Sequence, residues 1–124
     1  MAQLPPTVKS GSKGEAVKGL QNALNTRSSS VITVDGVFGP ATESAVKAFQ
    51  SDAGLAEDGI VGPDTWGALY VYLVQQGDTL SEIAEQQLGN ASRWHDLHNL
   101  NKVLVSDPDK IHPGQVLVLP IYAH

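Results

Sequence analysis

Two copies of one short segment stand in the chain: Asp35-Gly36-Val37-Phe38-Gly39-Pro40-Ala41-Thr42 and Asp58-Gly59-Ile60-Val61-Gly62-Pro63-Asp64-Thr65. Each copy joins an Asp-Gly turn and two apolar residues to a Gly-Pro pair. Glycine adopts the positive φ that such a turn requires. Proline suits the first position of a helix, where its missing N–H would have had no partner. The repeat therefore predicts two helices, beginning near Pro40 and Pro63, that are entered through the same loop geometry, which is typical of a small helical bundle.

Apolar residues on both sides of the repeat predict three helices in the first part of the chain. Ser12 and Glu15 have the spacing of a capping box, in which each side chain bonds a free backbone N–H at a helix start. The apolar stripes at helical spacing are Val17, Leu20 and Leu24, then Ala45, Val46 and Phe49, and last Trp66, Leu69 and Tyr70. We therefore expect a three-helix bundle in this part of the chain.

A different order begins after Tyr70. A short apolar run of strand type over residues 71–74 is followed by a turn and by a second capping box at Thr79 and Glu82. The helix that this box predicts ends at Gly89-Asn90, and its apolar face consists of Leu80, Ile83, Ala84 and Leu88. Next we expect a helix around Trp94, Leu97 and Leu100 with Ser92 as its cap, a polar loop over 106–114, and a strand over 116–119.

These segments predict an α+β chain in which an N-terminal three-helix bundle is followed by a βααβ unit. We place the boundary between residues 70 and 71, so that the two domains are 1–70 and 71–124. The joint has almost no linker, and we expect it to hold the two units nearly rigid. The apolar stretch 103–105 is interpreted either as a contact between the units or as a surface for a partner.

Composition excludes several functions. The 124 residues are 41% hydrophobic and 17% charged, which is typical of a soluble globular chain. Eight basic against thirteen acidic residues give a net charge of −5, which argues against binding nucleic acid through its phosphates. The absence of cysteine excludes disulfides, cysteine nucleophiles and thiolate metal sites. No apolar run is long enough to insert into a membrane, and the first ten residues carry no signal-peptide pattern.

Two known families resemble the two units. Residues 4–70 resemble the peptidoglycan-binding domain of the three-helix type, through Gly11-Ser12-Lys13-Gly14, Leu20-Gln21, Ala45-Val46, Phe49-Gln50, Thr65-Trp66 and both repeated corners. Residues 71–121 resemble a LysM domain, through Tyr72, Val74, Gly77-Asp78-Thr79-Leu80-Ser81, Ile83-Ala84, Trp94, Asn101 and the stretch 107–120. The βααβ fold of the LysM family agrees with the order of elements inferred above.

The resemblances imply a protein that binds the bacterial cell wall. LysM domains recognise chains of N-acetylated sugars, in peptidoglycan or in chitin, between the loop after the first strand and the loop before the second. The residues of this sequence that match those loops are Gly77, Asp78, Thr79, Leu80, Asp107, Pro108, Asp109, Lys110 and Ile111. A neutral glycan needs no basic patch, so the acidic net charge is compatible with this ligand.

Candidates for wall contact in the helical unit are Asp35, Asp58 and Trp66, and each has a competing structural role. The aspartates are placed to bond their own turn amides, and Trp66 lies on an apolar stripe. Trp94 is likewise expected in the core rather than against a sugar. His95, His98 and His112 come with no HExxH or other ligand motif, so we predict no metal site and no cofactor.

No catalytic constellation can be assembled from these residues. Asp52, Glu57 and Asp58 lie in a solvated turn, whereas a lysozyme-type mechanism needs two carboxylates with separated pKa values across a cleft. Two hypotheses remain for a non-catalytic chain. It is a targeting module that holds a protein such as a cell-wall hydrolase on the extracellular or periplasmic wall, or it is a structural adaptor in a phage tail or contractile injection apparatus.

Overall fold

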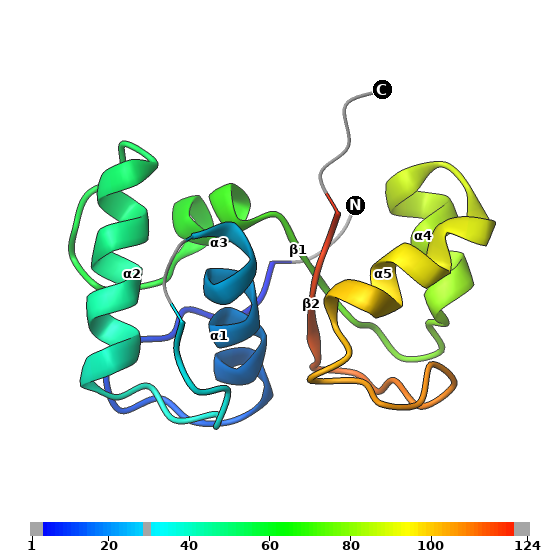
Figure 1. Cartoon of the computed structure of the whole chain (residues 1–124), viewed down its shortest axis with the longest axis horizontal. Coiled ribbons are helices and arrows are strands. Elements are labelled where there is room, and N and C mark those ends of the chain that lie inside the picture. Colours follow the sequence, from blue (N-terminus) through cyan, green and yellow to red (C-terminus); the bar gives the residue numbers. More distant parts are fainter. Residues whose placement is uncertain (1–3, 29–30, 121–124) are drawn as a thin grey trace.

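Five α-helices, one 3₁₀ turn and a two-stranded antiparallel sheet make up residues 4–28 and 31–120, the part of the chain that the computed structural model describes (Figure 1). In chain order the elements are α1 (Glu15–Arg27), α2 (Pro40–Asp52), α3 (Pro63–Leu69), β1 (Val71–Leu73), α4 (Leu80–Leu88), the 3₁₀ turn η1 (Ala91–Arg93), α5 (Trp94–Leu100) and β2 (Val116–Val118). The class is α+β, as predicted. Within these residues none of the helices has the length and apolarity that crossing a membrane requires.

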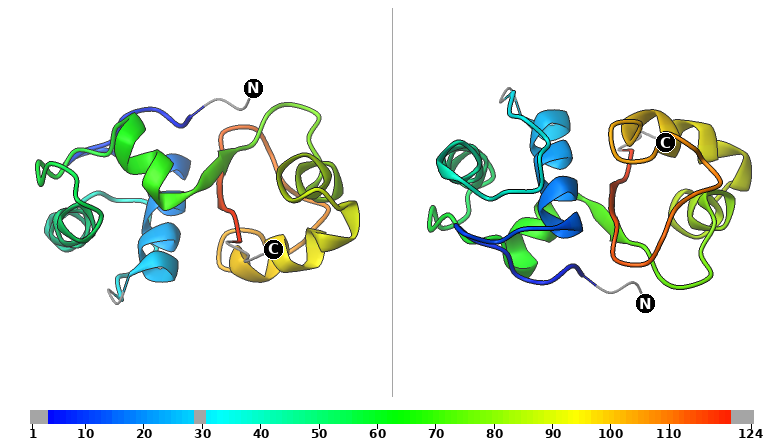
Figure 2. Two further views of the ribbon diagram at one scale, coloured as in Figure 1. Left: turned by 90° about the horizontal axis from the view of Figure 1, so that it is seen from above. Right: turned by 90° about the horizontal axis from the view of Figure 1, so that it is seen from below.

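The sheet lies between two groups of helices. Figure 1 shows α1, α2 and α3 on one side of the strands and α4 and α5 on the other, and the two views in Figure 2 agree. Pairing joins Val71 to Val118 and Leu73 to Val116. Because side chains alternate between the faces of a strand, Val116 and Val118 join the core of α1–α3, whereas Leu117 joins the core of α4 and α5. Both faces of β2 are therefore buried.

A buried glutamine organises each copy of the repeated corner. The Gln50 side chain in α2 is 1% exposed. Its Oε1 accepts the Gly59 N–H at 3.0 Å, and its Nε2 donates to the Ile60 carbonyl at 2.9 Å and to Asp58 Oδ1 at 3.1 Å. These bonds hold a turn in which Gly59 has a φ of 73°, a conformation that favours glycine. Gln21 in α1 organises the first corner in the same way, and its partners there are Asp35, Gly36, Val37 and Thr42.

Asp35 and Asp58 bond their own turns, as the sequence predicts. The Asp35 carboxylate accepts the Val37 N–H, and the Asp58 carboxylate accepts the Ile60 N–H, both at 3.0 Å. These backbone hydrogen bonds, with those from the two glutamines, lower the pKa of both carboxyl groups. The aspartates therefore close the turns in their ionised form.

The predicted helix starts at Pro40 and Pro63 are confirmed, but the box predicted at Ser12 and Glu15 is wrong. Helix α1 begins at Glu15 after Gly14, which has a φ of 117°, and no side chain caps it. Ser12 Oγ instead accepts the Lys9 N–H at 3.1 Å. The Ser12 carbonyl accepts an N–H from the first corner, so this segment is extended along that corner and cannot yet enter the helix.

Two further side chains at helix ends differ from prediction. Ser92 is not the cap of α5, because η1 precedes that helix and Asn90 Oδ1 accepts both the Ser92 N–H at 3.0 Å and its hydroxyl at 2.7 Å. Tyr70 was expected on the apolar stripe of α3. It follows the helix end with a φ of 59°, so its side chain leaves the stripe and is 38% exposed.

The apolar stretch 103–105 is divided between core and surface. Val105 is buried among the residues around α4 and α5, and Leu104 packs against them. Val103 is 62% exposed. Most of this stretch therefore supports the second unit from within.

The two units meet where α1 packs against β2. A methyl group at Gly19 would lie 2.4 Å from Val116 Cβ and 2.5 Å from the Val116 carbonyl oxygen. The same helix segment recurs in α2, as Ala16-Val17-Lys18-Gly19-Leu20-Gln21 matches Ala45-Val46-Lys47-Ala48-Phe49-Gln50. Ala48 is exposed, and α2 lies on the far side of α1 from the sheet (Figure 1). The helix that packs against the strand thus has glycine at this position, and the helix that does not has alanine.

Polar bonds accompany this packing. Asn22 in α1 donates to Asn101 Oδ1 at 3.1 Å, and Asn101 in turn accepts the Val118 N–H of β2 at 2.8 Å. Arg27 donates to the carbonyls of Leu69 and Leu119, and burial lowers its pKa. Among the residues that the structure describes, no buried side-chain nitrogen or oxygen lacks a hydrogen-bond partner.

We predict that Gly19→Ala lowers the free energy of unfolding by about 1–3 kcal/mol, because the added methyl group overpacks the contact with β2. Gly67→Ala in α3 is the matched control, since nothing lies within 4 Å of a methyl group there. That change should raise the free energy by about 0.5–1 kcal/mol through helix propensity. Urea unfolding of both variants checks this. Equal stability of the two variants would contradict the close approach of α1 to β2.

Candidate functional site

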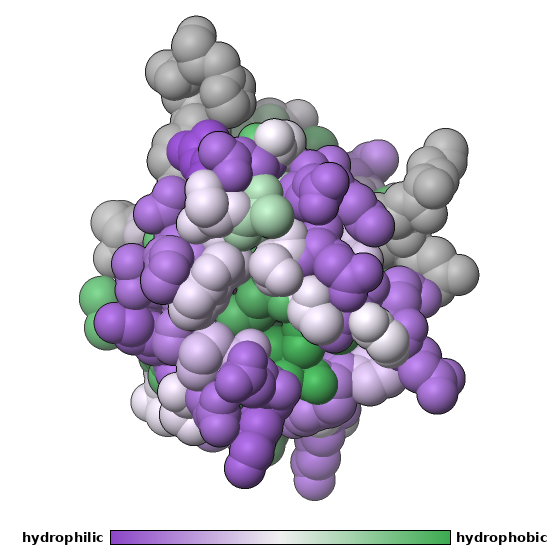
Figure 3. Space-filling model, turned by 90° about the vertical axis from the view of Figure 1, so that its right-hand side faces the viewer, coloured by the Kyte–Doolittle hydropathy of each residue, from purple (hydrophilic) through white to green (hydrophobic). Residues whose placement is uncertain are grey.

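A groove of about 290 Å³ opens in the second unit, between the start of α4 and the loop that leads to β2. Its lining consists of Asp78, Thr79, Leu80, Ser81, Trp94, Pro108, Asp109 and Ile111. Figure 3 faces this end of the molecule and shows apolar residues in a hollow with hydrophilic residues around it. Of the groove residues predicted from the sequence, Gly77, Asp107 and Lys110 are not in the lining.

The first wall of the groove is built by a helix cap. Thr79 Oγ1 accepts the Glu82 N–H at 3.2 Å, which confirms Thr79 as the cap of the helix. Glu82 Oε1 accepts the Thr79 hydroxyl at 3.0 Å and not a backbone N–H, so this contact differs from the second bond of the predicted capping box. The exposed Thr79 side chain stands at the groove edge while it caps α4. Leu80, the first residue of that helix, is buried and directs apolar surface into the groove.

Asp78 fixes the loop between β1 and α4. Its Oδ2 accepts the Tyr72 hydroxyl at 2.7 Å and the Gln75 N–H at 2.8 Å. Burial, with the hydrogen bond to Asp78 and the negative charge of that carboxylate, raises the pKa of Tyr72 to about 12. One carboxylate oxygen of Asp78 is therefore committed to the loop, and only the other is available to a ligand.

The opposite wall is a turn held by Asp107. Its Oδ1 accepts the Asp109 N–H at 3.0 Å, and its carbonyl accepts the Lys110 N–H at 2.9 Å. These bonds explain why the Asp107 side chain is turned into its own loop and is absent from the lining. They also present Pro108, Asp109 and Ile111 to the groove.

Trp94 is a groove residue that sequence reasoning missed. It was expected in the core, and it does pack against the second core while also lining the groove. Its ring stacks on His95, with ring centroids 3.7 Å apart. The feature that could have indicated this role is its position at the start of α5, because that turn of the helix lies beside the loop before β2.

The lining suits a neutral ligand with short apolar groups. Leu80, Trp94 and Ile111 supply apolar surface, while hydroxyl and carboxylate oxygens stand at the rim, and no Lys or Arg lines the groove. In residues 4–28 and 31–120 no three His, Asp or Glu side chains come together as ligands of a metal ion. Acetamide groups, with one methyl group and one amide, match this combination of surfaces.

Two family models cover most of the chain. The model described as a peptidoglycan binding domain, PG_binding_1, matches residues 13–69, and the model of the LysM domain matches residues 72–120. The chain is a peptidoglycan-binding domain fused to a LysM domain. The groove described above lies within the LysM domain, in the two loops that the sequence indicated.

Similar proteins include binders and enzymes. The chain is 37% identical over 91 residues to the potassium binding protein Kbp of Escherichia coli O6:H1, covering 72% of the chain and 61% of the relative. It is 47% identical over 66 residues to the zinc D-Ala-D-Ala carboxypeptidase of Streptomyces albus G, covering 52% of the chain and 26% of the enzyme. The crystal structure of the SleB N-terminal domain matches with a TM-score of 0.50 and 38% identity, over 52% of the chain and 88% of that domain. The chain thus spans less than two thirds of these two curated relatives.

The peptidoglycan-binding domain does not gather its three predicted wall residues into one site. Trp66 is fully buried, and its indole N–H donates to the Pro6 carbonyl at 3.0 Å, so it offers no surface to a polymer. Asp58 lines a second hollow of about 320 Å³, together with Gln50, Leu55, Ala56, Ile60, Gly62, Pro63, Asp64 and Thr65. Asp35 belongs to the other corner and lines neither of these hollows.

We predict that stability falls as pH rises from about 10 to 12, and that Tyr72→Phe removes this part of the fall. The folded pKa of Tyr72 is about 12, against an ordinary value of 10.0. In that range the unfolded phenol loses its proton while the folded one keeps it, so deprotonation favours unfolding. Urea unfolding across this range measures the effect. The same pH dependence in the variant and the parent chain would contradict the Tyr72–Asp78 bond.

Proposed function

We propose that this chain is a non-catalytic module that binds the N-acetylated glycan of peptidoglycan in its LysM groove and so holds a protein on the bacterial cell wall. Both domains belong to families of wall-binding modules. The main support for the proposal is the groove, which has an apolar floor between polar rims and no Lys or Arg in its lining. The corresponding location is the extracellular or periplasmic wall.

The groove offers each part of an acetylated sugar a chemical partner. Leu80, Ile111 and the edge of Trp94 would receive the acetyl methyl and the apolar face of the ring. Ser81, Asp109 and the free oxygen of Asp78 would receive hydroxyl and amide N–H groups. Because the ligand is neutral, binding of this kind is expected to resist salt.

The helical domain would supply a second contact on the same polymer. Its hollow at the second corner contains Asp58 beside the exposed Ile60. We propose that the helical domain ends at residue 70 and the LysM domain begins at residue 71. Two weak sites on these adjoining domains would raise each other's effective concentration on a repeating wall polymer. Asp35 and Trp66 are not part of this proposed contact.

Catalysis does not fit the groove residues. A glycoside hydrolase places two carboxyl groups with separate roles across the scissile bond, whereas Asp78 is bound to Tyr72 and the Gln75 N–H. The spacing Ser-x-x-Lys, which some acyl enzymes use, occurs at Ser10–Lys13 and Ser44–Lys47. These side chains are exposed and line neither hollow.

The proposal is tested by sedimentation with purified insoluble peptidoglycan, beside chitin and in a salt series. The parent chain should pellet at every salt concentration, and Ile111→Ala should weaken binding by about tenfold, the effect of losing roughly 1.4 kcal/mol of apolar contact. Val103→Ala is the matched control, because Val103 is an exposed apolar residue of the same loop that does not line the groove. Far-ultraviolet circular dichroism confirms that both variants are folded.

Two results would contradict this function. If the parent chain stays in the supernatant, wall binding fails, and the adaptor in a phage tail or injection apparatus becomes the leading hypothesis. If Ile111→Ala and Val103→Ala bind equally well, the wall is bound elsewhere than in this groove.

A further inference from the structure

We propose that helix α1 of the peptidoglycan-binding domain positions the glycan groove of the LysM domain, through Asn22 and Glu15. This inference rests on the proposed function, because it concerns the same groove. Between α5 and β2 runs the long loop that presents Pro108, Asp109 and Ile111. A loop without helix or strand depends on contacts at its ends for its position, and α1 contacts both ends of this one.

The first end is held by a pair of buried asparagines. Asn101, 1% exposed, accepts the Val118 N–H at 2.8 Å, and its amide donates to the carbonyls of Val118 at 3.0 Å and Leu97 at 2.7 Å. Its backbone carbonyl accepts the N–H groups of two loop residues, Leu104 at 2.9 Å and Val105 at 2.8 Å. Asn101 therefore ties the beginning of the loop to both β2 and α5.

Asn22 of α1 completes this arrangement. Its Nδ2 donates to Asn101 Oδ1 and to the Leu100 carbonyl, both at 3.1 Å. An amide oxygen has two acceptor positions and an amide nitrogen two donors, so with Asn22 in place the Asn101 side chain is fully hydrogen-bonded. Without Asn22, a buried oxygen of Asn101 and the last carbonyl of α5 each lose a donor, which disfavours the present position of the loop.

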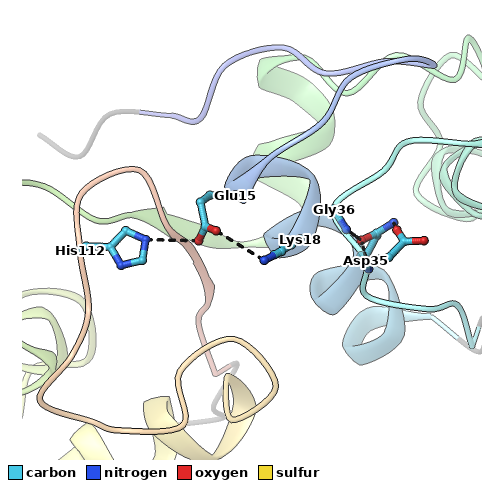
Figure 4. Close-up of polar contacts among 6 residues, drawn as sticks. Glu15, Lys18, Asp35, Gly36 and His112 are labelled. Carbon is cyan, nitrogen blue, oxygen red and sulfur yellow. Dashed lines mark hydrogen bonds and ion pairs between the residues drawn. The ribbon is translucent and has the colours of Figure 1, made fainter.

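The second end of the loop contacts the beginning of the same helix. His112, which directly follows the groove residue Ile111, has its Nε2 3.4 Å from Glu15 Oε2, and Lys18 Nζ lies 3.7 Å from the other oxygen of Glu15. Figure 4 shows Glu15 between these two side chains. The ion pair requires a protonated His112. Both partners are partly exposed, so its contribution is smaller than that of Asn22.

The internal repeat supports this role for α1. Residues that face their own corner are identical in α1 and α2, as in Lys18 and Lys47 or Gln21 and Gln50. Residues that face the LysM domain differ: Glu15, Gly19 and Asn22 of α1 correspond to Ser44, Ala48 and Ser51 of α2. All three α2 residues are exposed. The copy of the helix that touches the LysM domain therefore carries the residues that hold it.

The test compares Asn22→Ala with Ser51→Ala, the equivalent position of α2, in the full chain. Affinity for a soluble oligomer of N-acetylglucosamine should fall about five- to tenfold in Asn22→Ala and stay unchanged in Ser51→Ala. Amide hydrogen exchange is measured beside it and needs no ligand. We expect the Leu104 and Val105 amides to exchange faster in Asn22→Ala only.

The variant Glu15→Gln tests the Glu15 end of the loop separately. At pH 5.5, Glu15→Gln should lower glycan affinity by about two- to threefold, the size of effect expected for a partly exposed ion pair. Glu85→Gln is the matched control, because it changes an exposed carboxylate of α4 that lines neither hollow, and it should leave the affinity unchanged.

Unchanged affinity and unchanged exchange in Asn22→Ala would overturn the positioning role of Asn22. Equal glycan affinity of Glu15→Gln and the parent chain at pH 5.5 would overturn the role of Glu15. If the parent chain binds no glycan but Asn22→Ala still accelerates exchange at Leu104 and Val105, the proposed function fails while α1 is still shown to position the loop. Because the Glu15 side chain is partly exposed and belongs to neither core, Glu15→Gln tests the proposal even if Asn22→Ala does not fold.

Discussion

Burial of β2 on both faces is the constraint on which the rest of this structure depends. The strand is three residues long, and its alternating side chains belong to two different cores. One face needs α1 close enough that Gly19 has no room for a methyl group against Val116. The other face needs Leu117 beneath the helices of the LysM domain. Neither core is complete without this strand, so the two family domains are joined through shared packing rather than through a linker.

This shared strand bears on how the proposed binding to the cell wall would work. A flexible pair of modules would search the polymer independently, whereas two hollows on one body approach it in a fixed relation. The groove also inherits its geometry from the joint, because the loop before β2 is bounded by Asn101 at one end and His112 at the other. Both of these residues contact α1. A domain recognised by its own family signature thus receives part of its support from the neighbouring domain.

Local chemistry made much of this fold predictable. The Asp-Gly turns, the helix starts at Pro40 and Pro63 and the cap at Thr79 are decided within a few residues, and the structure has them where the sequence indicates. The predicted cap at Ser12 failed because a distant corner holds that segment extended. Ser92 does not cap α5, because a 3₁₀ turn capped by Asn90 comes before that helix. A cap predicted from local pattern therefore fails where a residue outside the pattern supplies a competing hydrogen bond.

The family resemblance located the groove, but it did not identify all of the residues that line it. Trp94 lies on an apolar stripe and lines the groove as well, and periodicity cannot distinguish these roles. The contact between α1 and β2 joins residues far apart in sequence, and its mark in the sequence is small: Gly19 stands where the repeat has Ala48. The reason for Gly19 is clear only once β2 is seen beside it, because nothing in α1 alone predicts which of its faces packs against a strand.

Because both cores share β2, the two domains should fold as one unit. The most direct test is a urea titration of the unmodified chain followed by NMR at its two indole N–H signals, Trp66 in the helical core and Trp94 beside the groove. Both native signals should disappear with one midpoint, as expected for two-state unfolding. Loss of the Trp94 signal while the native Trp66 signal persists, or the reverse, would show two independent units and contradict this expectation.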